Sequence, residues 1–319
     1  MRARAIAAAF AIDLLAGDPQ WFPHPVRAMG AAIAFGEPIA RRACGSGRER
    51  ERCAGALLSA AIIGAAAFAS LALPAYAERC AGRRGRTAVE VVLAATTIAT
   101  RDLLAEADAV LDALDARDLA FARARLARIV GRDTAHLDAS EIARATIETL
   151  AESACDGIVA PLCALALGGL PLAFAFKAAS TLDSTIGHIE PPYTDFGRFA
   201  AKLDDALCFV PARLTALAIC ALATCAGGSP ADAWATLIAD GGRHASPNAG
   251  RPEAAMAGAL RVRLGGSNRY GGVERYGAFS GERFEAPACA DARRARNLVF
   301  AVALVAGACT SLLVALRDA

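Results

Sequence analysis

Long uncharged stretches alternate with polar segments along the whole chain. Residues 54–77, 157–176, 214–231 and 298–316 contain no Asp, Glu, Lys or Arg. Each approaches or exceeds the roughly 18 to 20 residues that a helix needs to cross the hydrocarbon core of a bilayer. The pattern therefore predicts an all-α, polytopic integral membrane protein. A soluble helical bundle is the alternative, because many of these positions are Ala, which is only weakly hydrophobic.

The order of the apolar stretches creates a difficulty for any shared site. If all four cross fully, the polar segments alternate between the two sides of the membrane; these segments lie near 17–27, 131–156, 182–205 and 241–272. Gly168, Gly169 and Pro171 divide the run 157–181 into two pieces of about ten residues, each long enough for half a membrane. We therefore predict a re-entrant or broken helix near 157–181, buried in protein or lining a wet cavity. An additional crossing at 88–100 is the alternative.

The rest of the chain is expected to complete a single membrane-embedded domain over residues 1–319, because no fixed-period repeat or low-complexity linker interrupts it. Between residues 100 and 150, apolar positions such as Leu104, Ala107 and Leu111 recur at helical spacing with charged residues between them. This pattern predicts an extramembrane helical insert. Residues 232–296 are expected to form a polar loop region.

Composition narrows the classes of partner. The formal net charge is only +2 and the basic residues are scattered, which argues against nucleic acid. The ten cysteines include no C-x-x-C pair and several lie in apolar stretches, so we interpret them as small core residues. The signatures G-x-S-x-G, H-E-x-x-H and G-x-G-x-x-G are also absent from the sequence.

The first polar motif is GDPQWFPHPVR at 17–27. Its three prolines keep the backbone extended and rigid beside Asp18, His24 and Arg27, as a binding site requires. The alternative is a membrane-interface turn in which Trp21 serves as the anchor.

The second motif, at 131–157, contains Glu148, Glu152 and Asp156 at i, i+4 and i+8, on one helical face. Such a ladder is tolerable if it is solvated, or if Mg²⁺ or arginines neutralise it. It runs directly into an apolar stretch, which favours ion binding. The preceding residues Asp133 and Asp138 are candidates for a helix cap or for further ligands.

The third motif covers KAASTLDSTIGH at 177–188 and continues to Asp204 and Asp205. Lys177 and Asp183 emerge directly from an apolar stretch, where an ionisable group predicts function, although Lys177 can also reach the headgroups. The acids offer oxygen ligands of the kind that Mg²⁺ prefers. Arg213 would be costly in the bilayer if unpaired, so we expect it to meet one of these carboxylates.

The fourth motif covers 243–260 and the glycine-rich turn LGGSNRYGG at 264–272. Glycines let a backbone approach an anion closely, so a phosphate cradle is predicted, although most glycine-rich segments are simply turns. The spacing is not that of a Walker A loop. Nearby donors strengthen the interpretation as an anion site, namely Arg243, His244, Asn248, Arg251, Asn268 and Arg269.

Taken together, these segments resemble the CobD/CbiB family of adenosylcobinamide-phosphate synthases, integral membrane enzymes of cobalamin biosynthesis. The resemblance runs from about residue 10 to 275 and rests on motifs in the expected order: GDPQWFPHPVR, GRDTAHLD, ETLAESACDGIVAPL, KAASTLDSTIGH, YTDFGRFAAKLDDAL, VPARLTAL, SPNAGRPEAAMAGAL and LGGSNRYGG. Ser153, Ser180 and Arg251 depart from the family pattern of Asn, Asn and Trp. These departures bear on which amino alcohol is used.

The resemblance implies an ATP-dependent ligase that forms an amide bond between a propionate of adenosylcobyric acid and an amino-alcohol phosphate such as aminopropanol phosphate. ATP and Mg²⁺ are the implied cofactors, and the implied location is the cell membrane, with multiple crossings. Self-association or a complex with other corrinoid enzymes is compatible with this role. A membrane transporter or sensor on the same scaffold is the alternative function.

The motifs then supply the predicted site residues. For Mg²⁺ we predict Glu148, Glu152, Asp156, Asp183, Asp204 and Asp205. For the phosphate groups and other parts of the substrates we predict His24, Arg27, Arg243, Asn248, Arg269, Gly265 and Gly266. Catalytic roles are predicted for Asp183, Lys177, His188 and His244, one of the two histidines taking a proton from the attacking ammonium group.

Overall fold

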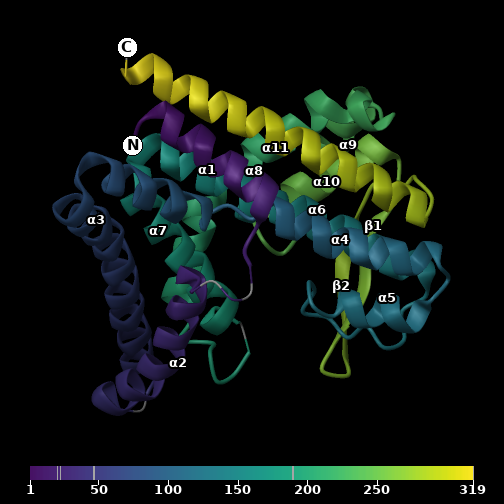
Figure 1. Cartoon of the computed structure of the whole chain (residues 1–319). Helices are drawn as coiled ribbons and strands as arrows, with labels where there is room; N and C mark the ends of the chain where they lie inside the picture. Colours follow the sequence, from purple (N-terminus) through teal and green to yellow (C-terminus); the bar gives the residue numbers. More distant parts are fainter. Residues whose placement is uncertain (20, 22, 46, 189, 319) are drawn as a thin grey trace. The chain divides into compact units, whose positions relative to one another are not determined.

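The protein is almost entirely helical, as the sequence predicts. The computed structural model describes residues 1–19, 21, 23–45, 47–188 and 190–318 (Figure 1). The chain forms two compact units, each assembled from separated stretches. The first unit comprises Met1–Ala99, Ala160–Cys208 and Gly307–Ala319, and the second comprises Thr100–Val159 and Phe209–Ala306.

The first unit is a bundle built around helix α3 (Arg48–Ala95), a long helix that is kinked at Ala81 and Gly82. Its elements are α1 (Ala3–Ala16), α2 (Pro25–Cys44), α3 (Arg48–Ala95), α7 (Ala160–Ile186), the first part of α8 (Arg198–Leu222) and the last part of α11 (Cys289–Asp318). Helix α3 packs against α1, α2 and α7, and α2 also contacts α7.

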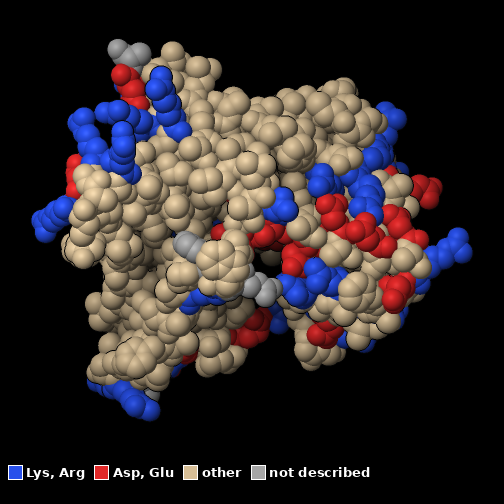
Figure 2. Space-filling model, viewed as in Figure 1, with Lys and Arg blue, Asp and Glu red and all other residues tan. Residues whose placement is uncertain are grey.

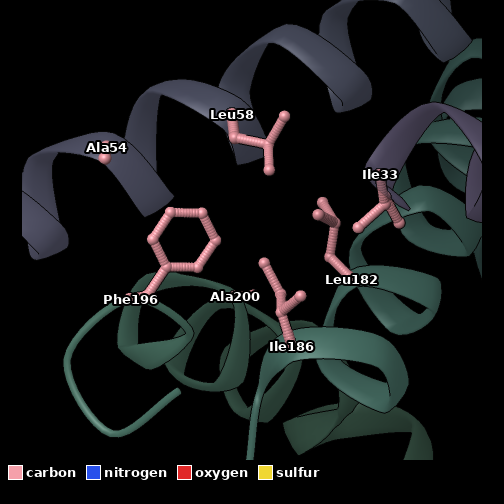
Figure 3. Packing of buried hydrophobic residues seen from close by; sticks show 7 residues of the cluster. All are labelled: Ile33, Ala54, Leu58, Leu182, Ile186, Phe196 and Ala200. Carbon is pink, nitrogen blue, oxygen red and sulfur yellow. The ribbon is translucent and has the colours of Figure 1, made fainter. Parts of the chain in front are cut away.

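A compact apolar cluster joins these helices. Figure 3 shows side chains from α2, α3, α7 and α8 converging on one another, namely Ile33, Ala54, Leu58, Leu182, Ile186, Phe196 and Ala200. Phe196 is fully buried, and the guanidinium of Arg41 lies 4.0 Å from the centre of its ring. Burial of each large apolar side chain contributes about 1.5–3 kcal/mol. The cluster therefore fixes the segment before α8 against α2 and α3.

Four helical segments are long and apolar enough to cross a membrane: Arg48–Asp115, Ala139–Ile186, Arg198–Ala226 and Cys289–Asp318. They coincide with the four uncharged stretches, so the predicted fold class is confirmed. On α3, Leu57, Phe68 and Leu71 are exposed, as expected of side chains that face lipid. In Figure 2 the charged side chains near α3 gather toward its ends.

Helix α7 is broken where the sequence predicts a break. Gly169 has φ 64° and ψ −153°, a conformation that is essentially restricted to glycine, and Pro171 lacks an amide hydrogen for the helical ladder. Helical structure continues on both sides, to Ile186. The prediction of a broken helix in this stretch is thus confirmed.

The second unit combines short helices with one hairpin. Its elements are α4 (Thr100–Asp115), α5 (Leu119–Leu126), α6 (Ala139–Ala154), the π-helix η1 (Cys155–Val159), the remainder of α8, the 3-10 helix η2 (Ala223–Ala226), α9 (Pro230–Asp240), α10 (Gly250–Leu260), β1 (Leu264–Tyr270), β2 (Val273–Ser280) and the first part of α11. Helices α6 and α10 are the most buried and contact each other. The stretch predicted as a helical insert is indeed helical, as α4, α5 and α6.

The region 232–296 is more ordered than the polar loop that the sequence suggests. It contains α9, α10 and an antiparallel hairpin in which Tyr270 pairs with Val273. The two intervening residues, Gly271 and Gly272, both have positive φ, which a two-residue hairpin turn requires. The glycine-rich segment thus forms a strand and a tight turn, because strands 264–270 and 273–280 satisfy each other's backbone groups.

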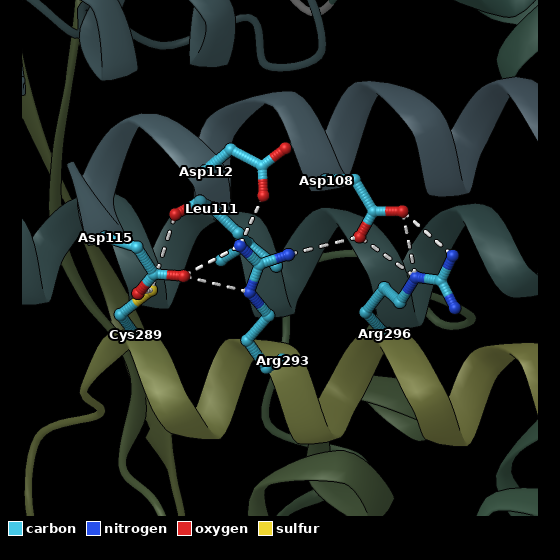
Figure 4. Close-up of polar contacts among 7 residues, drawn as sticks. All are labelled: Asp108, Leu111, Asp112, Asp115, Cys289, Arg293 and Arg296. Carbon is cyan, nitrogen blue, oxygen red and sulfur yellow. Dashed lines mark hydrogen bonds and ion pairs between the residues drawn. The ribbon is translucent and has the colours of Figure 1, made fainter.

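Charged side chains fasten α4 to the start of α11 within the second unit. Figure 4 shows three carboxylates of α4 facing two arginines of α11. Arg293 lies 2.7 Å from Asp115 and also pairs with Asp112 and Asp108, while Arg296 lies 2.8 Å from Asp108. These groups are partly exposed, so each pair contributes only about 0.2–1 kcal/mol. Their combined effect is to fix the orientation of the two helices.

Candidate functional site

A buried carboxylate, Glu148, lies at the centre of the second unit. It sits on α6, which begins with a capping box in which Asp138 and Glu141 exchange hydrogen bonds with each other's backbone amides. The side chain of Glu148 lies 2.6 Å from Arg132 and 3.1 Å from Arg144, and it accepts a hydrogen bond of 2.8 Å from the Gly265 amide. Two guanidinium groups and an amide therefore engage both oxygens of this carboxylate.

The same two arginines bind the hairpin. Arg144 donates to the carbonyl oxygens of Gly265 and Ser267 at 2.9 and 3.2 Å and to Asn268 Oδ1 at 3.0 Å. Arg132 donates to the same Asn268 oxygen at 2.8 Å. Burial alone would lower the pKa of Arg132, but the adjacent Glu148 carboxylate raises it. Both guanidiniums are held in fixed positions between α6 and β1.

The tip of the hairpin is held by Asp133. Its carboxylate accepts hydrogen bonds from the Gly271 amide at 3.2 Å and the Gly272 amide at 2.7 Å, and its own amide donates to Arg269 O at 2.7 Å. The segment before α6 and the hairpin therefore form one rigid framework. The second and fourth motifs, more than a hundred residues apart in the chain, meet here.

A second acid, Glu253 on α10, approaches Glu148 from across the interior. It is almost fully buried. Burial raises the pKa of Glu253 well above its usual value, and the charges of Glu148 and Glu152 raise it further. The surroundings of Glu253 thus favour its protonated form. We call Arg132, Arg144, Glu148, Glu253 and Asn268 the polar centre.

The loop before α10 carries the other predicted donors. His244 Nδ1 accepts a hydrogen bond of 3.0 Å from the Ser246 amide, and Ser246 Oγ accepts bonds of 3.2 Å from the amides of Asn248 and Ala249. Arg243 is exposed and pairs with Asp240 at 3.1 Å. The loop is therefore shaped by its own hydrogen bonds, and the side chain of Asn248 is buried beside α10.

Comparison with known proteins covers nearly the whole chain. Residues 6–299 match the family model described as CobD/Cbib protein. The cobalamin biosynthesis protein CobD of Pelobacter propionicus is 44% identical over 277 residues, which cover 87% of this chain and 84% of that protein. The chain belongs to the CobD/CbiB family.

Other members of the CobD/CbiB family give the same result. CobD of Geobacter metallireducens is 43% identical over 84% of this chain and 82% of its own length, and CbiB of Salmonella typhimurium is 40% identical over 90% and 86%. Both carry the description of a cobalamin biosynthesis protein. No solved structure shows significant similarity to the chain. The geometry of the site in this CobD/CbiB member therefore comes from its own residues alone.

Sequence analysis of this CobD/CbiB chain missed three members of the polar centre. Arg144 stands four residues before Glu148, which is the spacing of a helical ion pair, so this contact was open to prediction. Glu253 is the only charged residue between Arg251 and Arg261, a signal that was also present. Arg132 gave no such signal, because only the fold brings it to Glu148.

The predicted metal ladder of the CobD/CbiB chain is altered by the fold. Both oxygens of Glu148 are engaged by protein donors. Asp156 lies in the π-helix η1, whose wider turn interrupts the α-helical spacing from Glu148 through Glu152. Among the three acids of the ladder, Glu148 is thus held chiefly by arginines. Neutralisation by arginines is the alternative to Mg²⁺ that the sequence left open.

The predicted glycine-rich cradle also has another local structure in this CobD/CbiB member. Gly265 and Gly266 lie in strand β1 rather than in a turn, and the Gly265 amide is used by Glu148. Arg269 is exposed on the same strand. The turn of the glycine-rich segment lies at Gly271 and Gly272, because residues 264–270 pair with 273–280.

The remaining predicted residues lie in the first unit. His24 is the N-cap of α2, where its Nδ1 accepts a bond of 3.3 Å from the Val26 amide and its Nε2 lies 3.0 Å from Asp18. Arg27 is exposed on α2. The others follow the bundle helices: Lys177 and Asp183 on α7, His188 just after it, and Asp204 and Asp205 on α8.

One expectation for an arginine is corrected. Arg213 was expected to meet a carboxylate. Within the second unit, however, it donates to Phe209 O at 2.6 Å and to Asn248 Oδ1 at 3.4 Å, and it lies over the Phe209 ring. An amide oxygen and an aromatic face take the place of the acid, because α8 brings Arg213 to the loop before α10.

Proposed function

We propose that the protein is an adenosylcobinamide-phosphate synthase. It joins a propionate carboxyl of adenosylcobyric acid to the amine of an amino-alcohol phosphate, with aminopropanol phosphate or a close relative as the amine. The observation that carries the proposal is the buried Glu148–Arg132–Arg144 assembly in a chain that belongs to the CobD/CbiB family. Fixed positive groups in a water-poor site stabilise transferring phosphoryl groups.

The chemistry requires activation of a carboxylate. A carboxylate oxygen attacks the terminal phosphorus of ATP, the bond to the bridging oxygen breaks, and ADP leaves. One proton first passes from the ammonium nitrogen to a base, and the free amine then attacks the acyl carbon of the resulting acyl phosphate. The bond from the acyl carbon to the phosphate oxygen breaks, and inorganic phosphate leaves with the second proton of the nitrogen. The amide forms without any change of oxidation state.

Two histidines are candidates for that base. The hydrogen bond from the Ser246 amide to His244 Nδ1 leaves the proton of the neutral ring on Nε2. Neutral His244 would then offer the substrate a donor rather than a lone pair. We therefore assign proton removal to His188, which is exposed and lies 5.8 Å, centre to centre, from the Tyr193 ring.

Carboxylate oxygens suit the Mg²⁺ that accompanies ATP. In the second unit, Glu152 and Asp156 keep their proposed role as metal ligands, whereas both oxygens of Glu148 are engaged by protein donors. In the first unit, Asp183, Asp204 and Asp205 keep their proposed role as metal ligands. Mg²⁺ would supply charge neutralisation to the phosphates, and the chain would supply its position.

The test uses the full chain, purified in detergent or placed in lipid vesicles. Adenosylcobyric acid, aminopropanol phosphate, ATP and Mg²⁺ are supplied, and the corrinoid amide is measured by mass spectrometry beside ATP consumption. We expect ATP consumption that requires both the corrinoid and the amine. A transporter or sensor would consume no ATP in this coupled way, and that result would refute the proposal.

Variants connect the activity to the polar centre. Glu148→Gln should lower the ligation rate by about 100-fold or more, because Arg132 and Arg144 lose the carboxylate that holds them in position. Asp183→Asn should abolish ligation in a folded protein. Glu106→Gln is the matched control, because Glu106 also pairs with two arginines, Arg125 and Arg128, but at a partly exposed position. Full activity of the first two variants would remove these residues from the mechanism.

A further inference from the structure

Two arginines of the second unit, Arg213 and Arg251, lie near each other. Arg213 lies on α8, and Arg251 lies in the first turn of α10. They are near enough for the charge of Arg251 to act on Arg213. Among the described residues of this unit, neither guanidinium makes an ion pair with a carboxylate. Two like charges are thus held together without a counter-charge, an arrangement that is costly unless an anion joins them.

The hydrogen bonds of both groups are incomplete. Arg213 donates through Nη1 to Phe209 O and Asn248 Oδ1, and the Phe209 ring supports the guanidinium from one face at 3.4 Å from its centre. The Nε atom of Arg251 is buried and has no hydrogen-bond partner among the described residues. Buried donors in proteins are nearly always satisfied, so each orphan needs an explanation.

The backbone leaves space beside Arg251. A Cβ atom built on Gly242 would lie 3.6 Å from Arg251 Nη2, and one built on Gly241 would lie 3.3 Å from its Cδ. With hydrogen at both positions, the loop provides room next to the guanidinium. Helix α10 begins at Gly250 without a side-chain cap, and its N-terminal end adds partial positive charge.

We propose that Arg213, Arg251 and Asn248 bind the terminal phosphate of a water-soluble substrate. Two fixed guanidiniums carry a charge of +2, which matches a phosphate monoester dianion, whereas a carboxylate would neutralise only one of them. The oxygens of a phosphate can accept hydrogen bonds from the unused donors of Arg213 and Arg251. The amino-alcohol phosphate is one compound that carries such a phosphate, and its assignment to this site rests on the proposed function. ATP is the other, because its terminal phosphate offers the same oxygen acceptors.

The first experiment measures binding alone, so it does not depend on ligation. Calorimetric titration of the purified full chain uses aminopropanol phosphate, ATP and unphosphorylated aminopropanol. Arg213→Gln and Arg251→Gln should each weaken binding of one phosphorylated probe by at least about 10-fold, the loss expected for one charged hydrogen bond. Binding of the unphosphorylated amine should not change.

The matched control is Arg283→Gln. Arg283 is exposed in the same unit and pairs with Asp232 at 3.2 Å, so this variant loses the same charge away from the site. Its affinities should equal those of the unmodified protein. If Arg213→Gln does not fold, Arg213→Lys replaces it; this variant keeps the charge but loses the planar fork and should bind with intermediate affinity.

The two sources are separated by which probe responds. A change confined to aminopropanol phosphate assigns the site to the amine substrate, and a change confined to ATP assigns it to the nucleotide. Unchanged affinity for both probes in both variants would overturn the proposal. So would phospholipid that co-purifies with the unmodified chain and is lost in these variants, because the site would then hold a lipid phosphodiester. Weakened binding in a chain without ligation would refute only the proposed function.

Discussion

At the scale of single residues, the buried acid Glu253 has a consequence that stability measurements can detect. Burial and the neighbouring carboxylates raise the pKa of Glu253 in the folded protein, so the folded state binds this proton more tightly than the unfolded state does. Its stabilising contribution is full below the usual Glu pKa and is lost as pH rises toward the raised value. Raising the pH between the usual Glu pKa and this raised pKa therefore lowers the free energy of unfolding.

Replacing Glu253 with Gln should remove the pH dependence that this side chain gives to the stability of the protein. We expect the melting temperature of Glu253→Gln to exceed that of the unmodified protein by an amount that grows between pH 5 and pH 8. Each kcal/mol of difference in the free energy of unfolding corresponds to about 2–4 °C. Thermal unfolding in detergent without divalent metal measures it. The exposed acid Glu282, changed to Gln, serves as control. A difference that stays constant with pH would contradict the raised pKa.

The same residues show what single-chain reasoning can reach. Glu148 was predicted as a site residue because its acidic ladder runs into an apolar stretch, and Asn248 because it stands among donors near the glycine-rich segment. The partners of Glu148 were harder to predict, since Gly265 and Arg132 meet it only through the packing of the hairpin on α6. Sequence shows that a buried charge needs a partner, but not which distant residue supplies it.

At the scale of elements, the break in α7 depends on one residue. Gly169 adopts φ 64° and ψ −153°, a backbone conformation that is strained for every other residue. A Cβ atom at this position would meet no steric clash. Gly169→Ala should therefore destabilise the protein by about 1–3 kcal/mol through backbone strain alone. Chemical or thermal unfolding in detergent measures the loss.

A second glycine provides the opposite expectation. Gly30 lies within α2 with helical backbone and open space around it. Gly30→Ala should be neutral or stabilising by up to about 1 kcal/mol, because Ala is the better helix former. Equal effects of the two substitutions would show that the kink at Gly169 does not require glycine.

The helices and strands differ in how clearly the sequence predicts them. The Gly-Gly-x-Pro run predicted the break in α7, and Asp138 was recognised as a possible cap of α6. The hairpin was missed, because LGGSNRY has too many glycines and too little alternation to resemble a strand. Its stability comes from Arg144, Asp133 and the paired strand rather than from local preference.

At the scale of the whole molecule, the candidate spans are not alike. Only 22% of the apolar window of Arg48–Asp115 is buried within the protein, against 67% for Ala139–Ile186. The first therefore has the surface of a lipid-facing helix. The second is enclosed mainly by protein, which is where broken backbone is tolerated at membrane depth. The sequence predicted both stretches as apolar, but burial, which depends on neighbours, could not be read from it.

This difference bears on how the chain crosses the membrane. The stretch from residue 157 to the break at Gly169 extends only about 18 Å as a helix, well short of the roughly 30 Å of a bilayer core. We therefore expect the two ends of the broken segment to reach the same side. Cysteines placed at Ala135 and Ser184, both exposed, in a chain whose native cysteines are replaced, should react with a membrane-impermeant maleimide from one side only. Labelling from opposite sides would establish a complete crossing instead. It would also require the polar groups before α6 and those after α7 to act in different compartments, because a kinked helix that spans the bilayer separates its ends.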